Sequence, residues 1–271
     1  RQDELPERRS FSALLSKHAN LQEKDIVTLC KSAGFDYVKK RCCLTVLFQN
    51  TTALSMVRYS LLRDIIIQIS DWISTFLMQN FYLCEYENCR IYYLLFPNEI
   101  PAGEIFACAN EIAKHAMELF TKSGFACKIG ISGISADLSQ IAGSFYHTLD
   151  LIDLGRKLFP EEQIFTSNQL QVYLWLRKTM RREELEQMCQ STVKPLQEHS
   201  TPALDYVQIL EKYIENRYNV SKTASALHFH RNTLINYLAR IQQLLPLSMD
   251  DSENMVKIQL GLRALRVLSV E

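Results

Sequence analysis

One segment near the C-terminus constrains the fold more than any other part of this 271-residue chain. Residues 220–245 read VSKTASALHFHRNTLINYLARIQQLL. In a short first helix, Ala224 and Leu227 are expected to be buried. In a second segment, apolar residues recur every three or four positions and form a stripe. The members of this stripe are Leu234, Leu238, Ile241 and Leu245. The spacing predicts two helices joined by a turn at residues 228–230, the layout of a helix-turn-helix.

The ends of both helices can be placed from residue types. Ser221 is expected to cap the first helix because its hydroxyl can accept a backbone N–H. The second helix is expected to begin near Arg231 and to stop before Pro246. Phe229, in the turn between them, is expected to fill the core under the motif.

The charge of this segment suits a polyanionic partner. Residues 216–249 contain four Lys and Arg side chains and no Asp or Glu, whereas the whole chain balances 30 basic against 30 acidic residues. A segment without carboxylates can approach the phosphates of duplex DNA without repulsion. We therefore expect double-stranded DNA as the partner, with the second helix in its major groove.

Polar side chains of the motif are candidates for DNA contact. Asn and Gln amides can pair with adenine through two hydrogen bonds, and Arg can do the same with guanine or bind a phosphate. The predicted DNA-binding residues are Lys222, Thr223, His230, Arg231, Asn232, Thr233, Asn236, Tyr237, Arg240 and Gln243. The helix geometry alone leaves a second interpretation open, in which this is an ordinary helical hairpin with a solvated face.

Residues 227–234, LHFHRNTL, followed by Leu238 and Arg240-Ile241, resemble the C-terminal helix-turn-helix of PucR/CdaR-type bacterial transcriptional regulators. The pattern continues through Asp250-Asp251 into a last apolar helix. Where the family usually has Tyr-Arg, this chain has Asn236-Tyr237, which removes one expected phosphate or base contact. The resemblance implies a regulator of a catabolic operon, such as one for purine or sugar-acid breakdown.

The middle of the chain predicts an α/β domain. Strands are expected at residues 41–49, 81–86, 89–96, 125–133 and 162–166, and helices at 53–78, 102–122 and 137–158. The order β-α-β-β-α-β-α-β is close to a ferredoxin-like sandwich with additions. In the first of these helices, Leu54, Val57, Leu61, Ile65, Ile69, Trp72 and Phe76 are expected to face the core.

This order also resembles the GGDEF-like domain of the same regulators, with Ile129-Gly130-Ile131-Ser132 as the best matching run. Active GGDEF cyclases hold metal ions with carboxylates on the first strand and on a Gly-Gly-Asp/Glu-Glu-Phe hairpin. Here the first strand ends Phe48-Gln49-Asn50-Thr51, and the hairpin at residues 84–90 reads CEYENCR. Glu85 and Glu87 remain as a chance pair, but the paired glycines are absent. We expect a degenerate domain and no enzyme, catalytic residue or cofactor.

The eight cysteines are scattered and form no CxxC pair, so neither a disulfide framework nor a metal site is expected. Free thiols favour the cytoplasm. The longest apolar run, residues 61–77, is interrupted by Arg63, Asp64 and Asp71, so no membrane partner is expected.

The predicted organisation has four parts. They are an N-terminal helical segment at residues 1–38, the GGDEF-like domain at 39–167, a helical connector at 168–200 and an all-α helix-turn-helix domain at 201–271. Within the last domain, Thr201 is expected to cap a helix over 203–216. The chain begins at Arg1, which suggests that an N-terminal sensor for a small-molecule effector is missing.

A helix-turn-helix reads a palindrome through two copies, so a homodimer or higher homo-oligomer is expected. The N-terminal helix, the segment around Trp175 and the last helix are alternative dimer surfaces. Two other functions stay open. One is a nucleotide- or small-molecule-binding enzyme on the α/β domain, and the other is an oligomerisation module that no longer binds DNA.

Overall fold

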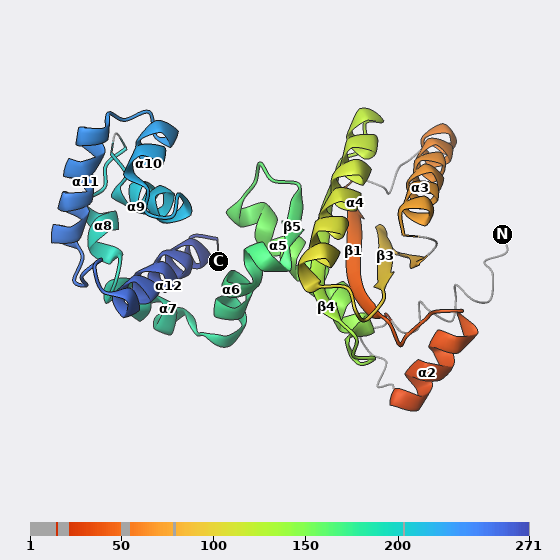
Figure 1. Ribbon diagram of the computed structural model, residues 1–271. Helices are drawn as coiled ribbons and strands as arrows, with labels where there is room; N and C mark the ends of the chain where they lie inside the picture. The colour runs from red at the N-terminus through yellow and green to blue at the C-terminus, as the bar shows by residue number, and fades with distance from the viewer. Residues whose placement is uncertain (1–14, 16–21, 50–54, 78–79, 203, 271) are drawn as a thin grey trace. The chain divides into compact units, whose positions relative to one another are not determined.

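The computed structural model describes residues 15, 22–49, 55–77, 80–202 and 204–270 (Figure 1). The chain separates into two compact units, residues 1–171 and 172–271. Most of the N-terminal helix that was one of the alternative dimer surfaces lies outside the described residues, as does Leu54. Within the described part of the chain, no helix is both long enough and apolar enough to cross a bilayer.

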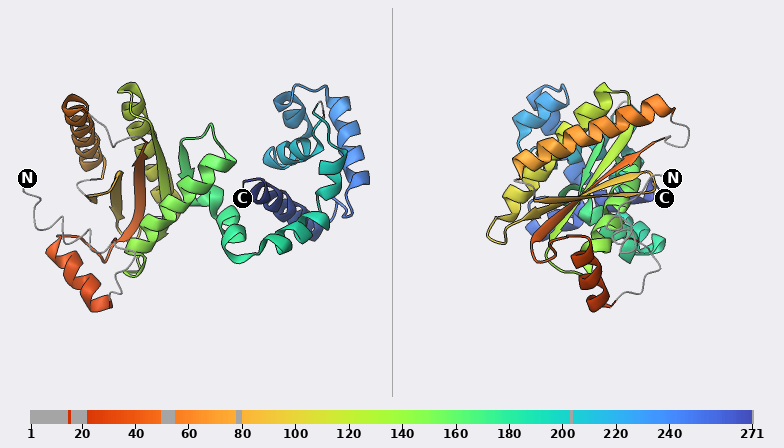
Figure 2. Two further views of the ribbon diagram at one scale, coloured as in Figure 1. Left: turned by 180° about the vertical axis from the view of Figure 1, so that it is seen from behind. Right: turned by 90° about the vertical axis from the view of Figure 1, so that its right-hand side faces the viewer.

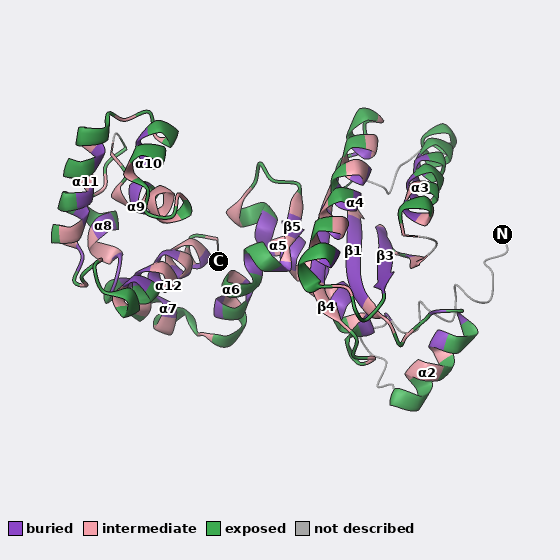
Figure 3. Ribbon diagram, in the orientation of Figure 1, coloured by how far each residue is buried: buried purple, intermediate pink, exposed green. Residues whose placement is uncertain are grey.

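Unit 1 is built on a five-stranded sheet with the order β2-β3-β1-β4-β5. The strands are β1 (Lys40–Phe48), β2 (Phe81–Tyr86), β3 (Cys89–Phe96), β4 (Cys127–Ser135) and β5 (Ile164–Thr166). All neighbours pair antiparallel except β4 and β5, which are parallel. The central strands β1 and β3 are buried almost throughout (Figure 3). Their near-continuous apolar sequences reflect a sheet that is covered on both faces.

Helices cover the two faces of this sheet (Figure 2). On one face, α3 (Met56–Phe76) and α4 (Ala102–Lys122) pack against alternate β1 side chains such as Leu44 and Val46. On the other face, α2 (Glu23–Ser32) and α5 (Gln140–Leu158) pack around Cys43 and Tyr93. The alternation along β1 separates the two cores, because successive strand side chains point to opposite faces.

The predicted core face of α3 was partly wrong. Ile65 and Ile69 are buried as expected, but Val57, Leu61 and Phe76 are 78%, 42% and 47% exposed. The buried stripe instead comprises Leu62, Ile65, Ile66, Ile69 and Ile73. In a helix with apolar residues on several sides, more than one helical register fits the spacing, and contact with the sheet selects one of them.

Helix α5 approaches β4 closely because Gly130 has no side chain. A Cβ built on Gly130 would lie 2.6 Å from the backbone oxygen of Thr148 on α5. The buried Thr148 hydroxyl donates a hydrogen bond to the Phe145 carbonyl at 2.6 Å and also contacts the Thr45 hydroxyl of β1 at 2.6 Å. Gly130 therefore fixes the packing of α5 on the sheet.

All eight cysteines are free thiols, and most are buried. Burial raises the pKa of Cys42, Cys89 and Cys127 to about 12 and that of Cys30, Cys108 and Cys189 to about 11. These thiols stay protonated near neutral pH, which makes them poor nucleophiles and poor metal ligands. No group of three or more His, Cys, Asp or Glu side chains in the described ranges is placed to hold a metal ion.

Unit 2 is helical. It follows α6 (Ser167–Thr179), which spans the division between the units, and contains α7 (Arg182–Gln190), α8 (Lys194–His199), α9 (Tyr206–Glu215), α10 (Val220–Ala226), α11 (Arg231–Leu244) and α12 (Ser252–Leu268). One core joins α8, α9, α10, α11 and α12 through residues such as Leu196, Leu210 and Ile258. Helix α12 also packs on α7 and on the turn after it, where a Cβ on Gly261 would lie 2.0 Å from the Thr192 hydroxyl oxygen.

The start of α9 differs from expectation. Helix α9 begins at Tyr206, with Asp205 as its N-cap, rather than after Thr201. The Asp205 carboxylate accepts the Val207 and Gln208 N–H groups at 2.9 and 3.1 Å, whereas the Thr201 hydroxyl accepts the Leu204 N–H in a preceding turn. Pro195 lies in the first turn of α8, a position that tolerates proline.

Candidate nucleic-acid interface

The first helix of the motif, α10, is capped by Asn219 rather than by Ser221. The Asn219 side-chain oxygen accepts the Lys222 N–H at 2.9 Å, and the residue has the extended backbone that an N-cap requires. This places Thr223 on the inner face, where it is fully buried and its hydroxyl donates to the Asn219 carbonyl at 2.8 Å. Thr223 therefore supports the fold of α10 and does not reach the surface, contrary to its predicted role in DNA contact.

The turn between α10 and α11 is held by three consecutive residues. His228 adopts a left-handed backbone, with φ 57°. The Phe229 N–H then donates to the Ala224 carbonyl at 2.8 Å, and its half-buried ring contacts Tyr237 edge to face at a centroid distance of 5.4 Å. His230 is the N-cap of α11, and its Nδ1 accepts the Asn232 N–H at 3.3 Å.

Helix α11 presents two different faces. Leu234, Leu238 and Ile241 are buried as expected, with Leu245 buried just after the helix ends. Away from this stripe, the exposed polar residues are Arg231, Asn232, Asn236, Arg240 and Gln243, together with His230 and with Lys222 of α10. The Arg240 guanidinium donates to the Gln243 side-chain oxygen at 3.2 Å. A row of amide and guanidinium groups is therefore open to a ligand along one side of the helix.

Two predicted contacts lie at the margin of this surface. Thr233 is half-buried, and so is Tyr237. The Tyr237 ring packs between Phe229 and Tyr206 of α9, the latter at a centroid distance of 6.4 Å. The main role of Tyr237 is thus to fix α11 against the turn and against α9.

One exposed large hydrophobic residue of α11 is not among the predicted contacts. Ile235 is 40% exposed and lies outside the core stripe. The signal in the sequence is an aliphatic residue that falls outside the apolar stripe of the helix.

Acidic groups that flank the motif are held in other interactions. Glu211 of α9 accepts two hydrogen bonds from the Arg266 guanidinium of α12, at 2.6 and 2.5 Å, and this pairing raises the pKa of Arg266. Asp251 caps α12 by accepting the Asn254 N–H at 2.8 Å. Glu215 pairs with Lys212 at 2.6 Å. Glu211, Glu215 and Asp251 are therefore used in the scaffold of the motif.

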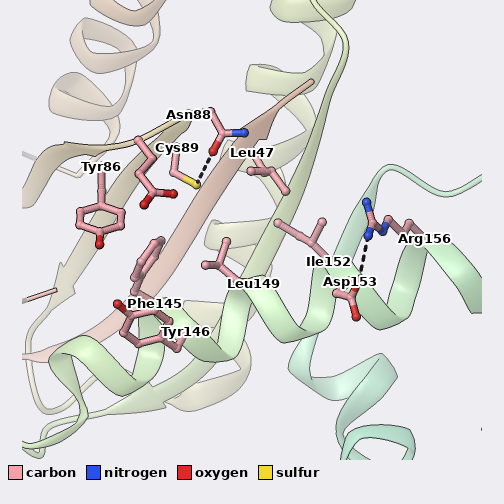
Figure 4. Close-up of a pocket in the computed structure, with 11 residues that line it drawn as sticks. Leu47, Tyr86, Asn88, Cys89, Phe145, Tyr146, Leu149, Ile152, Asp153 and Arg156 are labelled. Atoms are coloured by element: carbon pink, nitrogen blue, oxygen red, sulfur yellow. Dashed lines mark hydrogen bonds and ion pairs between the residues drawn. The ribbon is translucent and has the colours of Figure 1, made fainter. Parts of the chain in front are cut away.

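Unit 1 contains a cavity of about 450 Å³ beside the β2–β3 hairpin. Figure 4 shows Phe145, Tyr146 and Leu149 of α5 facing Tyr86 and other residues of the hairpin. At the rim, Arg156 forms an ion pair with Asp153 at 2.9 Å. The predicted Glu85–Glu87 pair is divided, because Glu85 lies opposite Arg90 and contacts it at 3.1 Å, whereas Glu87 occupies the turn with φ 51°.

Comparisons with known proteins agree with the geometry of unit 2. Residues 206–264 match the PucR C-terminal helix-turn-helix domain. The chain is also 28% identical over 142 residues to the purine catabolism regulatory protein of Bacillus subtilis (strain 168), a match that covers 52% of this chain and 26% of that protein.

A solved structure covers nearly the whole chain at lower similarity. It is the regulator of polyketide synthase expression from Bifidobacterium adolescentis, with a TM-score of 0.40 and 14% identity over 97% of this chain and 92% of that one. The region matched to the Bacillus subtilis regulator covers about a quarter of the length of that protein. Helices α9 to α12 thus form a domain that is similar to the C-terminal helix-turn-helix domain of PucR-type transcriptional regulators.

Proposed function

We propose that this chain binds duplex DNA by inserting α11 into the major groove and thereby regulates transcription of a catabolic operon. The observation that carries the proposal is the exposed row of amide and guanidinium side chains on α11, on a segment that contains no carboxylate between residues 216 and 249. Such groups match the hydrogen-bonding edges of base pairs and the charge of the phosphates.

The exposed residues divide into two proposed roles. Asn232, Asn236 and Gln243 project amides from the face opposite the core stripe, which suits contact with base edges. Lys222, His230, Arg231, Thr233 and Arg240 lie at the edges of that face or on α10, which suits contact with phosphates and sets the register of the protein on DNA. Thr223 and Tyr237 act indirectly, by holding α10 and α11 in place.

We propose further that residues 39–167 form a ferredoxin-like, GGDEF-like domain that mediates assembly or relays a signal without catalysis. The antiparallel order β2-β3-β1-β4 supports the topology. The Glu85–Arg90 pair supports the absence of a metal-binding carboxylate cluster at the hairpin. We place the protein in the cytoplasm, as a homodimer, with residues 168–200 as a connector between this domain and the DNA-binding domain at 201–271.

The test is DNA binding measured against salt concentration, with duplexes selected from a random-sequence library. The observed affinity should fall steeply as salt rises, with a logarithmic slope of about −0.9 for each phosphate contacted. Lys222→Ala should weaken binding to all duplexes and make the slope shallower by about one contact. Asn232→Ala should cost about 1–3 kcal/mol on the selected site and relax its preference at one position.

Lys157→Ala, on an exposed position of α5 in unit 1, is the matched control and should change neither quantity. If Lys222→Ala and Asn232→Ala bind the selected and unrelated duplexes as the wild-type chain does, α11 is not the recognition helix. A chain that binds no duplex at low salt would instead support the oligomerisation module.

A further inference from the structure

Ile235 leaves an apolar side chain on the proposed DNA-binding side of α11. It is 40% exposed, while the three aliphatic residues of the core stripe in α11 are at most 9% exposed. Ile235 follows Asn232 by three residues and precedes Ala239 by four, so these residues are neighbours along one side of the helix. The result is an apolar strip beside the exposed amides of Asn232 and Asn236.

A single exposed aliphatic residue is common on protein surfaces and usually needs no explanation. Ile235 differs because of where it lies. The core stripe is complete without it, and helix-forming polar residues would serve a purely solvated position equally well. Its neighbours on the outer side are amides and arginines rather than carboxylates, so any partner that meets those amides also meets Ile235.

The major groove offers one apolar group that distinguishes base pairs, the C5-methyl of thymine. The amides of Asn232 and Asn236 match adenine, which presents N7 as an acceptor and N6 as a donor. An aliphatic side chain next to two amides therefore fits neighbouring A·T pairs. Such pairs present both the adenine edge and the thymine methyl group in the major groove. The Arg240 guanidinium, which would favour guanine, shares a hydrogen bond with Gln243 further along the helix.

We propose that Ile235 packs against a thymine C5-methyl and that, together with Asn232 and Asn236, it makes the half-site rich in A·T pairs. The inference rests on the proposed function, since it assigns the base chemistry that the same helix face reads. Removal of one methyl from water is worth about a fourfold change in affinity. Ile235 is thus a specificity-determining residue rather than a source of general affinity.

Deoxyuridine provides the sharpest test, because it differs from thymidine only by lacking this methyl. Each thymine of a selected duplex is replaced singly, and the affinity of the full chain is measured at one salt concentration. The wild-type chain should lose about fourfold at one position in each half-site. Ile235→Ala should bind the thymine and uracil duplexes equally, and Ile235→Val, which keeps a branched side chain, should retain most of the difference.

Val256→Ala is the matched control, since Val256 is an apolar residue of α12 with 52% exposure, and it should discriminate thymine from uracil as the wild type does. The inference is overturned if no single uracil weakens the wild type, if Ile235→Ala keeps the difference, or if the selected half-sites contain only G·C pairs at the contacted positions. In each of these cases DNA binding itself persists. Failure to select any duplex would overturn the proposed function and this inference together.

Discussion

His230 shows how a single residue connects the turn to the recognition helix. Its Nδ1 accepts the Asn232 N–H and satisfies one of the free backbone donors at the start of α11. The N–H in this hydrogen bond belongs to Asn232, whose side chain is a proposed base contact. The cap therefore orients the first turn of α11 as well as stabilising it.

Two substitutions of His230 should separate the effect of its cap on stability from the effect of its side-chain size. His230→Ala should destabilise α11 by about 0.5–2 kcal/mol because the Asn232 N–H loses its acceptor, and His230→Asn should restore most of that stability because asparagine is a preferred N-cap. Hydrogen exchange of the amides of residues 231–236 measures the effect locally. Equal exchange rates in the wild type and His230→Ala would mean that the ring does not act as a cap.

Caps were also where prediction at the residue scale was least accurate. The apolar stripe placed α10 and α11 correctly, and Arg231 was expected to begin α11. However, the residue types favour Ser221 as the cap of α10, whereas Asn219 holds that position. Both types are good caps. Only the backbone conformation determines which of two nearby candidates is the last non-helical residue before the helix. The same ambiguity placed Thr223 on the surface instead of in the core.

At the scale of elements, the contact between β4 and α5 depends on one missing side chain. Gly130 and Gly133 both lie on β4, but only Gly130 faces a backbone atom at a distance that no Cβ tolerates. A backbone oxygen cannot rotate away as the end of a flexible side chain can. The helix or the strand would have to move.

We therefore expect Gly130→Ala to destabilise unit 1 by about 1–3 kcal/mol, the usual cost of overpacking. Gly133→Ala on the same strand is the matched control, because a Cβ there has no neighbour within 4 Å. Urea denaturation of both variants, with hydrogen exchange of residues 127–158 to localise the change, compares them. Equal losses in the two variants would show that strand propensity, rather than contact with α5, determines the cost.

Element boundaries in the α/β domain were largely predictable, and the faces of helices were less so. The bounds of β2, β3 and α4 agree with expectation because polar turns and Pro101 delimit them. Helix α8 was missed because its six residues are too few for a periodic pattern. The exposure of Val57 and Leu61 on α3 could not be predicted, because the buried face of the helix depends on the sheet beneath it.

For the molecule as a whole, the order of elements along the chain could be predicted, and with it the mixed α/β class and the C-terminal helical domain. Which strands are neighbours depends on contacts between segments far apart in sequence, as in the pairing of Lys40 with Phe96. The division into residues 1–171 and 172–271 depends in the same way on packing, since α7 contacts α12 across some 70 residues of chain.

The proposed homodimer makes a prediction about the spacing of DNA sites. Two copies of α11 related by a two-fold axis should read inverted half-sites separated by about one turn of DNA, roughly 10 bp, or by a multiple of it. Insertion of about 5 bp between the half-sites rotates one of them by half a turn, so the affinity of the full chain should drop to that of a duplex with one half-site. Insertion of about 10 bp returns both half-sites to the same side of the duplex and should recover part of the loss. This separates a rotational effect from a simple effect of distance.

Titrations of the original duplex and the two with insertions, with the single half-site as control, measure the difference. If all three bind with the same affinity, each half-site is bound by an independent monomer, and the two-fold arrangement is wrong even though α11 still reads DNA.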